Sequence, residues 1–197
     1  MKSFSLIATA AVAIVLTSCD RPVREQPGKV QLSKDELIKK GSYLVKIGGC
    51  HDCHSPKVMT EFGPVPDTSR LLSGHPHEQP FPDGPSLPPG TALFAPGQTA
   101  AKGPWGISYA ANLTPDDTGI GNWTFEQFET AIRKGKYKGL EKSRPLMPPM
   151  PWQMYQNFSD EDLRAVFTYL KSLKPVDNLV PPIITMDKLQ SINTINQ

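Results

Sequence analysis

Apolar residues recur at helical spacing in three segments of the chain, and polar positions separate them. Each segment begins at a serine or threonine, and in two of them a Glu or Gln three residues later completes a capping-box pattern. A glycine or a proline ends the second and third segments. The pattern therefore predicts three helices of about 10–15 residues, from about 34 to 48, from Thr124 to Gly135 and from Ser159 to Pro175.

Residues 55–104 show neither helical nor strand periodicity, and they hold 11 of the 21 prolines. Loops of this length are uncommon in compact domains unless they cover a site or bind something. We therefore expect a largely irregular, proline-stiffened segment that wraps around a functional site and contains at most a short strand or turn. A disordered insertion is the alternative interpretation.

The N-terminal residues 1–18 are typical of a secretory signal, with Lys2 followed by an apolar run that is short for a membrane span. The run ends just before Cys19 and resembles the bacterial lipoprotein signal, in which such a cysteine is lipidated and becomes the mature N-terminus. An ordinary cleavage site near a chance cysteine is the alternative. We expect export and a lipid anchor in the cell membrane, facing the periplasm or the cell exterior. Residues 19–33 would then be a flexible tether, and residues 176–197 a C-terminal tail on the surface.

Composition and charge narrow the class of protein. With 38% hydrophobic and 20% charged residues, the chain is not a disordered polyelectrolyte, a multi-span membrane protein or a coiled coil. Its 21 basic and 19 acidic residues are spread along the sequence and leave a net charge of +2. Nucleic-acid binding usually needs a concentrated basic face, so we expect no nucleic-acid partner.

The chemistry is carried by one C-x-x-C-H motif, formed by Cys50, Cys53 and His54, which is the attachment signature of c-type haem. Two cysteines three apart on a short helical segment can each form a thioether with one vinyl group, while the histidine binds the iron. The motif occurs once, which predicts one covalent haem c. A redox-active dithiol would need a βαβ context, and a structural zinc site would need His75 and His77 as further ligands.

A helix that ends in this motif, together with the last helical segment at residues 162–173, resembles a class I cytochrome c. The segments 111–116 and 118–124 are similar to the cytochrome c domains that serve bacterial periplasmic alcohol, sugar and related dehydrogenases. The resemblance covers residues 34–175 and implies an all-α fold of three to four helices around one haem. Residues 55–104 would be a long proline-rich loop insertion in that fold.

The resemblance also implies roles for residues outside the motif. In such folds the first and last helices cross at small residues and an aromatic side chain, here Gly41 and Tyr169. A methionine sulfur usually binds the iron opposite the histidine from a proline-rich loop before the last helix, which indicates Met150, with Met147 as its rival. Trp123 resembles a tryptophan whose indole N–H faces a haem propionate, and a core tryptophan with a backbone partner is the alternative.

The remaining candidate ligands have simpler interpretations. We expect Met59 and Met154 to be packing residues. His75 and His77 are expected to be solvated in a loop, and iron ligation by two histidines is the alternative that would use one of them. Two cations late in the second helix are further candidates for the propionates, although such charges usually just favour the helix dipole: Arg133 and Lys134.

Taken together, these features predict a membrane-anchored electron carrier rather than an enzyme. It would pass one electron at a time from a periplasmic dehydrogenase to a respiratory acceptor such as an oxidase or another cytochrome, because His/Met ligation leaves no open iron position. A haem-based ligand sensor or a peroxide-handling enzyme with an open sixth position is the alternative. A third possibility is a fixed subunit of a dehydrogenase complex, with a docking surface that would include Phe62, Phe81, Leu87, Phe94 and Trp105.

Overall fold

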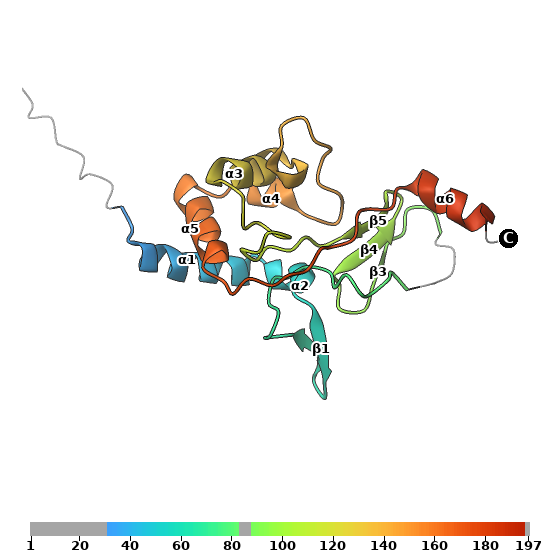
Figure 1. The fold of residues 1–197 in the computed structure, drawn as a ribbon, viewed down its shortest axis with the longest axis horizontal. Coiled ribbons are helices and arrows are strands. Elements are labelled where there is room, and N and C mark those ends of the chain that lie inside the picture. The colour runs from blue at the N-terminus through green and yellow to red at the C-terminus, as the bar shows by residue number, and fades with distance from the viewer. Residues whose placement is uncertain (1–30, 83–87, 196–197) are drawn as a thin grey trace, which may run out of the picture. The chain divides into compact units, whose positions relative to one another are not determined.

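The computed structural model of the protein describes residues 31–82 and 88–195 (Figure 1). The predicted signal segment 1–18, the lipid attachment site Cys19 and most of the predicted tether lie outside these residues. Within the described part, no helix is both long enough and apolar enough to cross a membrane.

The three predicted helices are confirmed as α1 (Lys34–Ile47), α3 (Phe125–Lys134) and α5 (Asp160–Lys171). Each begins with a complete capping box, in which the side chain of the N-cap residue and that of the third helical residue bond each other's backbone N–H. The described residues also contain shorter or later helices that periodicity did not predict: α2 (Cys50–His54), a 3-10 turn (Tyr137–Gly139), α4 (Trp152–Tyr155) and α6 (Met186–Ile195).

The segment expected to be largely irregular, residues 55–104, contains one antiparallel hairpin and two of the three strands of a second antiparallel sheet. The strands β1 (Lys57–Thr60) and β2 (Gly63–Pro66) form a hairpin. The second sheet has the order β3-β4-β5, formed by β3 (Leu93–Phe94), β4 (Ala100–Gly103) and β5 (Gly106–Tyr109). The fold is therefore not all-α. Strands this short leave too little alternation to be detected, and prolines are tolerated in an edge strand such as β2.

The hydrophobic core forms where α1 and α5 cross, side by side in Figure 1. A Cβ atom on Gly41 would lie 2.1 Å from the carbonyl oxygen of Ala165 and 2.7 Å from Cβ of Tyr169. The predicted crossing at Gly41 and Tyr169 is thus confirmed, because only glycine permits this approach. Seven buried side chains form the core: Val45, Leu72, Ile120, Phe128, Leu163, Val166 and Leu170.

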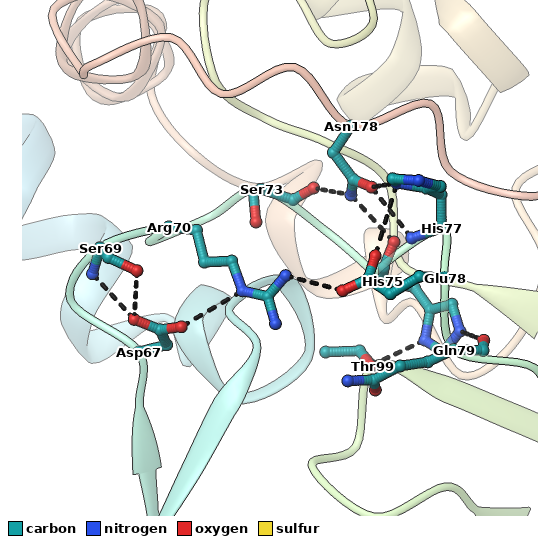
Figure 2. Close-up of polar contacts among 10 residues, drawn as sticks. All are labelled: Asp67, Ser69, Arg70, Ser73, His75, His77, Glu78, Gln79, Thr99 and Asn178. Carbon is teal, nitrogen blue, oxygen red and sulfur yellow. Dashed lines mark hydrogen bonds and ion pairs between the residues drawn. The ribbon is translucent and has the colours of Figure 1, made fainter.

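Part of the predicted surface tail is built into the fold (Figure 2). Asn178 is 6% exposed, and its Nδ2 donates hydrogen bonds to the carbonyl oxygens of Ser73 (2.7 Å) and His75 (2.9 Å). Its Oδ1 accepts a hydrogen bond from the backbone N–H of His77. Further along, Ile184 pairs with Ile107 of β5. The tail therefore joins the segment after the C-x-x-C-H motif to the second sheet.

Candidate functional site

The side chains of the C-x-x-C-H motif line one large, mostly apolar cavity. The motif forms α2, whose N-cap Gly49 has the left-handed φ of 68° that a glycine adopts readily. Cys50, Cys53 and His54 all lie on the cavity wall. Other parts of the wall come from α1, α3 and α5, from β4 and β5, from the segment at residues 110–123 and from the loop at residues 144–151.

The His54 imidazole is held in the form that binds metals. Its Nδ1 lies 2.8 Å from the carbonyl oxygen of Ala111. A carbonyl only accepts, so Nδ1 carries the proton and Nε2 keeps its lone pair. Burial lowers the pKa of His54, which favours the neutral ring. Among the described residues Nε2 has no hydrogen-bond partner, so it is available to a ligand in the cavity.

The two motif cysteines are unpaired thiols among the described residues. Burial raises the pKa of Cys50 to about 11 and also raises the pKa of Cys53. A redox-active C-x-x-C pair works through a lowered thiol pKa. The raised pKa values of the two thiols therefore argue against dithiol exchange chemistry at this motif.

Two methionines from the proline-rich loop reach the same cavity. Met147 and Met150 both line its wall, and the backbone N–H of Met150 donates to the carbonyl oxygen of Met147 at 3.3 Å. Either sulfur is thus brought to the site of the motif, and the choice between them stays a prediction. The packing role expected for Met59 and Met154 is wrong, since these side chains are 78% and 70% exposed. Met59 lies in the exposed hairpin strand β1, and Met154 lies on the one-turn helix α4, which contains no buried residue.

The expectation that His75 is solvated is wrong. The residue is 1% exposed, and both of its ring nitrogens have hydrogen-bond partners (Figure 2). Nε2 lies 2.6 Å from the carbonyl oxygen of Gln79, so Nε2 carries the proton and donates. Nδ1 then accepts from the hydroxyl of Thr99 at 2.9 Å. No lone pair remains for iron or zinc. His77 is exposed, as expected, and contacts Asn178.

Trp123 lines the cavity, and its indole N–H has no hydrogen-bond partner among the described residues. The backbone partner of the alternative interpretation is therefore missing. The two cations considered for propionates lie elsewhere. Arg133 pairs with Glu129 and Asp160. Lys134 pairs with Glu141, an exposed residue that follows the 3-10 turn.

Several wall residues were not identified from the sequence, because long-range contacts bring them to the site. The hydroxyl of Tyr155 donates to the carbonyl oxygen of Gly48 at 2.6 Å, next to the motif. Ser108 donates to the carbonyl oxygen of Pro148 at 2.6 Å and so ties β5 to the methionine loop. The other polar wall residues that were missed are Gln98, Thr99, Tyr109, Tyr137 and Arg144.

Comparison with known proteins adds the class of protein. No protein-family model matches the chain. It is 33% identical over 138 residues to the gluconate 2-dehydrogenase cytochrome c subunit of Pantoea cypripedii, covering 70% of this chain and 23% of that protein. It is 30% identical over 182 residues to the fructose dehydrogenase cytochrome subunit of Gluconobacter japonicus, covering 90% of this chain and 30% of that protein. A diheme cytochrome c-type protein of Cereibacter sphaeroides is 26% identical over 181 residues, which are 88% of this chain and 50% of that protein.

These similarities support a cytochrome c family for the chain and suggest a cytochrome c fold. More particularly, the first two relatives are cytochrome subunits of dehydrogenases. The chain spans less than a third of the length of those two relatives.

Proposed function

We propose that the protein is a one-electron carrier that holds one covalent haem c in this cavity. The observation that supports the proposal most directly is the neutral His54 ring, whose unpartnered Nε2 lies on the same apolar wall as two thiols. Haem c needs a donor set of three kinds: an imidazole lone pair, two thiols one helical turn apart and a nearby thioether. The residues present therefore fit this cofactor.

Each residue of the proposed site has a separate task. Cys50 and Cys53 would hold the haem through thioethers, and His54 would bind the iron, oriented by its hydrogen bond to the carbonyl oxygen of Ala111. Met150 would be the second protein ligand of the iron, with Met147 as the rival. When bound, haem c supplies an iron that accepts and releases one electron. Two protein ligands leave no open iron position, and an apolar wall with a methionine ligand raises the reduction potential.

We further propose that the electron donor is a dehydrogenase and that the acceptor is a respiratory oxidase or another cytochrome. The gluconate 2-dehydrogenase and fructose dehydrogenase relatives support the donor, because they are named as the cytochrome subunits of such enzymes. The single C-x-x-C-H motif supports one haem in this chain.

The location follows from the N-terminal sequence. We propose that the chain is exported and anchored in the cell membrane through a lipid on Cys19. A Cys19→Ala variant should release the haem protein from washed membranes into the soluble fraction, because two or more acyl chains are what make such anchoring stable. Unchanged membrane retention of this variant would instead indicate a protein partner.

Haem staining after denaturing electrophoresis tests the covalent site. The exported chain should stain at its own size, because thioether bonds survive denaturation. A Cys50→Ser, Cys53→Ser double variant should lose the stain, while Cys19→Ala serves as a matched cysteine control and should keep it. If the unmodified exported chain never stains, the proposal is wrong.

A further inference from the structure

Arg144 is the one Asp, Glu, Lys or Arg side chain among the described residues of the cavity wall. It lies in the loop that also carries Met147 and Met150. The backbone N–H of Tyr137 donates to the carbonyl oxygen of Arg144 at 3.0 Å, which fixes the start of this loop against the 3-10 turn. The fold therefore holds the backbone of Arg144 beside the cavity that its side chain lines.

The contacts of this guanidinium are all with groups that are uncharged at neutral pH. Nη1 donates to the carbonyl oxygen of Pro145 at 2.9 Å. The guanidinium carbon lies 3.8 Å from the ring centroid of Tyr137, in a cation–π arrangement. Four other cations in the described part of the chain have a carboxylate within ion-pair distance: Lys40, Arg70, Arg133 and Lys134. Arg144 has none there, like Arg164 and most of the described lysines, and it differs from those in lying on the cavity wall.

An arginine that is partly buried without a counter-charge is costly to retain unless a ligand supplies one. Burial lowers the pKa of Arg144, which expresses this cost. A haem carries two propionate groups, and the planar guanidinium fork matches a carboxylate in a bidentate pair. The missing partner of Arg144 and the charge of the proposed cofactor are therefore complementary.

We propose that Arg144 binds a haem propionate and thereby raises the reduction potential of the iron. This inference rests on the proposed haem site. It assigns to Arg144 the role that the sequence suggested for Arg133 and Lys134, both of which already have carboxylate partners. A positive charge held at the cofactor favours the reduced iron, because the reduced state carries one positive charge less.

The reduction potential of the purified holoprotein tests this role. Arg144→Gln should shift the one-electron equilibrium about tenfold toward the oxidised form, as Coulomb's law gives for a unit charge about 10 Å away at an effective dielectric constant near 20. A tenfold shift is about 59 mV for one electron. Arg144→Lys keeps the charge and should retain most of the potential. Lys138→Gln is the matched control, because Nζ of Lys138 lies 5.7 Å from the centroid of the same Tyr137 ring but Lys138 is outside the cavity wall. Its loss should shift the equilibrium less than about twofold.

Haem staining of every variant separates this inference from the proposed function. An unmodified chain without haem would refute the haem site itself. With haem present, equal shifts for Arg144→Gln and Lys138→Gln, or no shift for Arg144→Gln, would overturn the inference. An unchanged potential with slower reduction by the dehydrogenase would assign Arg144 to partner docking instead. If Arg144→Gln takes up no haem, Arg144→Lys decides: it should bind haem near the original potential, and its failure to do so overturns the inference.

Discussion

The two sides of the cavity are held together in different ways. The helical side, made by α1, α3 and α5, is stabilised by apolar side chains that interlock where the helices cross. The side made by β4, β5 and the tail after residue 175 is stabilised by buried polar side chains that bond backbone carbonyl oxygens. Asn112 bonds that of Val176 and Asn178 bonds that of Ser73, both far along the chain, while His75 bonds that of Gln79, four residues away. Apolar packing follows a local pattern in the sequence, whereas a polar network depends on which groups the fold brings together.

The difference also has an energetic side. A helix crossing loses stability in proportion to the volume removed from it. A buried polar network loses stability because each partner left behind keeps an unsatisfied group. Substitutions on the two sides should therefore differ in how much they lower the free energy of unfolding and in which segment they loosen.

The largest loss is expected from Leu163→Ala on the helical side. Leu163 is 0% exposed at the crossing of α5 with the core, so its truncation should lower the free energy of unfolding by about 2–5 kcal/mol. Urea unfolding followed by circular dichroism measures the change. Leu179→Ala is the control, because Leu179 is 71% exposed and should change stability by less than about 0.5 kcal/mol. A similar small change for both variants would contradict the described core.

A smaller loss is expected from Asn178→Ala on the other side. The substitution leaves the carbonyl oxygens of Ser73 and His75 without the amide that bonds them, and the expected cost is about 1–3 kcal/mol. The tail should also become more accessible to protease. The exposed neighbour Asp177→Ala provides the control. Equal stability of the two variants would show that the buried network contributes little.

The same contrast explains what the sequence could predict about the fold. The capping boxes at Ser33 and Thr124 are local signals, so the first two helices could be placed to within one or two residues. The third helix ends at Lys171, earlier than the expected stop at Pro175. The strands β4 and β5 are each four residues long and are joined by a two-residue turn, so they are too short to show a detectable period. His75 was expected to be solvated because it stands in a polar, proline-containing stretch. Its burial depends on Thr99 and Gln79, which satisfy both ring nitrogens.

The candidate site divides along the same line. Cys50, Cys53 and His54 could be identified because their chemistry is contained in one short motif. The carbonyl that orients His54 belongs to Ala111, 57 residues away, and no local pattern indicates it. Arg144 was missed for the same reason. Among the described residues of the cavity wall it is the one Asp, Glu, Lys or Arg side chain, which only the folded structure shows.

The smallest effect concerns pH. Burial lowers the pKa of His75 in the folded state below its ordinary value of 6.5. The unfolded chain therefore binds a proton that the folded chain resists, so stability is retained above about pH 6.5 and is lost as pH falls below it. Between pH 7 and pH 6 the loss should be below about 1 kcal/mol.

Thermal unfolding at the two pH values measures this loss in the unmodified protein and in His75→Gln. The other histidines are common to both proteins, so the difference isolates His75. The variant should show the weaker pH dependence. A His75→Gln profile parallel to that of the unmodified protein would contradict the buried neutral ring.

The absorption spectrum of the oxidised protein tests most directly whether the two sides of the cavity complete a saturated iron site. With His54 from the motif and Met150 from the proline-rich loop as ligands, it should show the weak far-red sulfur-to-iron band. Met150→Ala should abolish this band and lower the reduction potential, while Met147→Ala should keep both. The reverse pattern would make Met147 the ligand. Absence of the band from the unmodified protein, with rapid carbon monoxide binding to its reduced form, would contradict the electron carrier and indicate an open iron site.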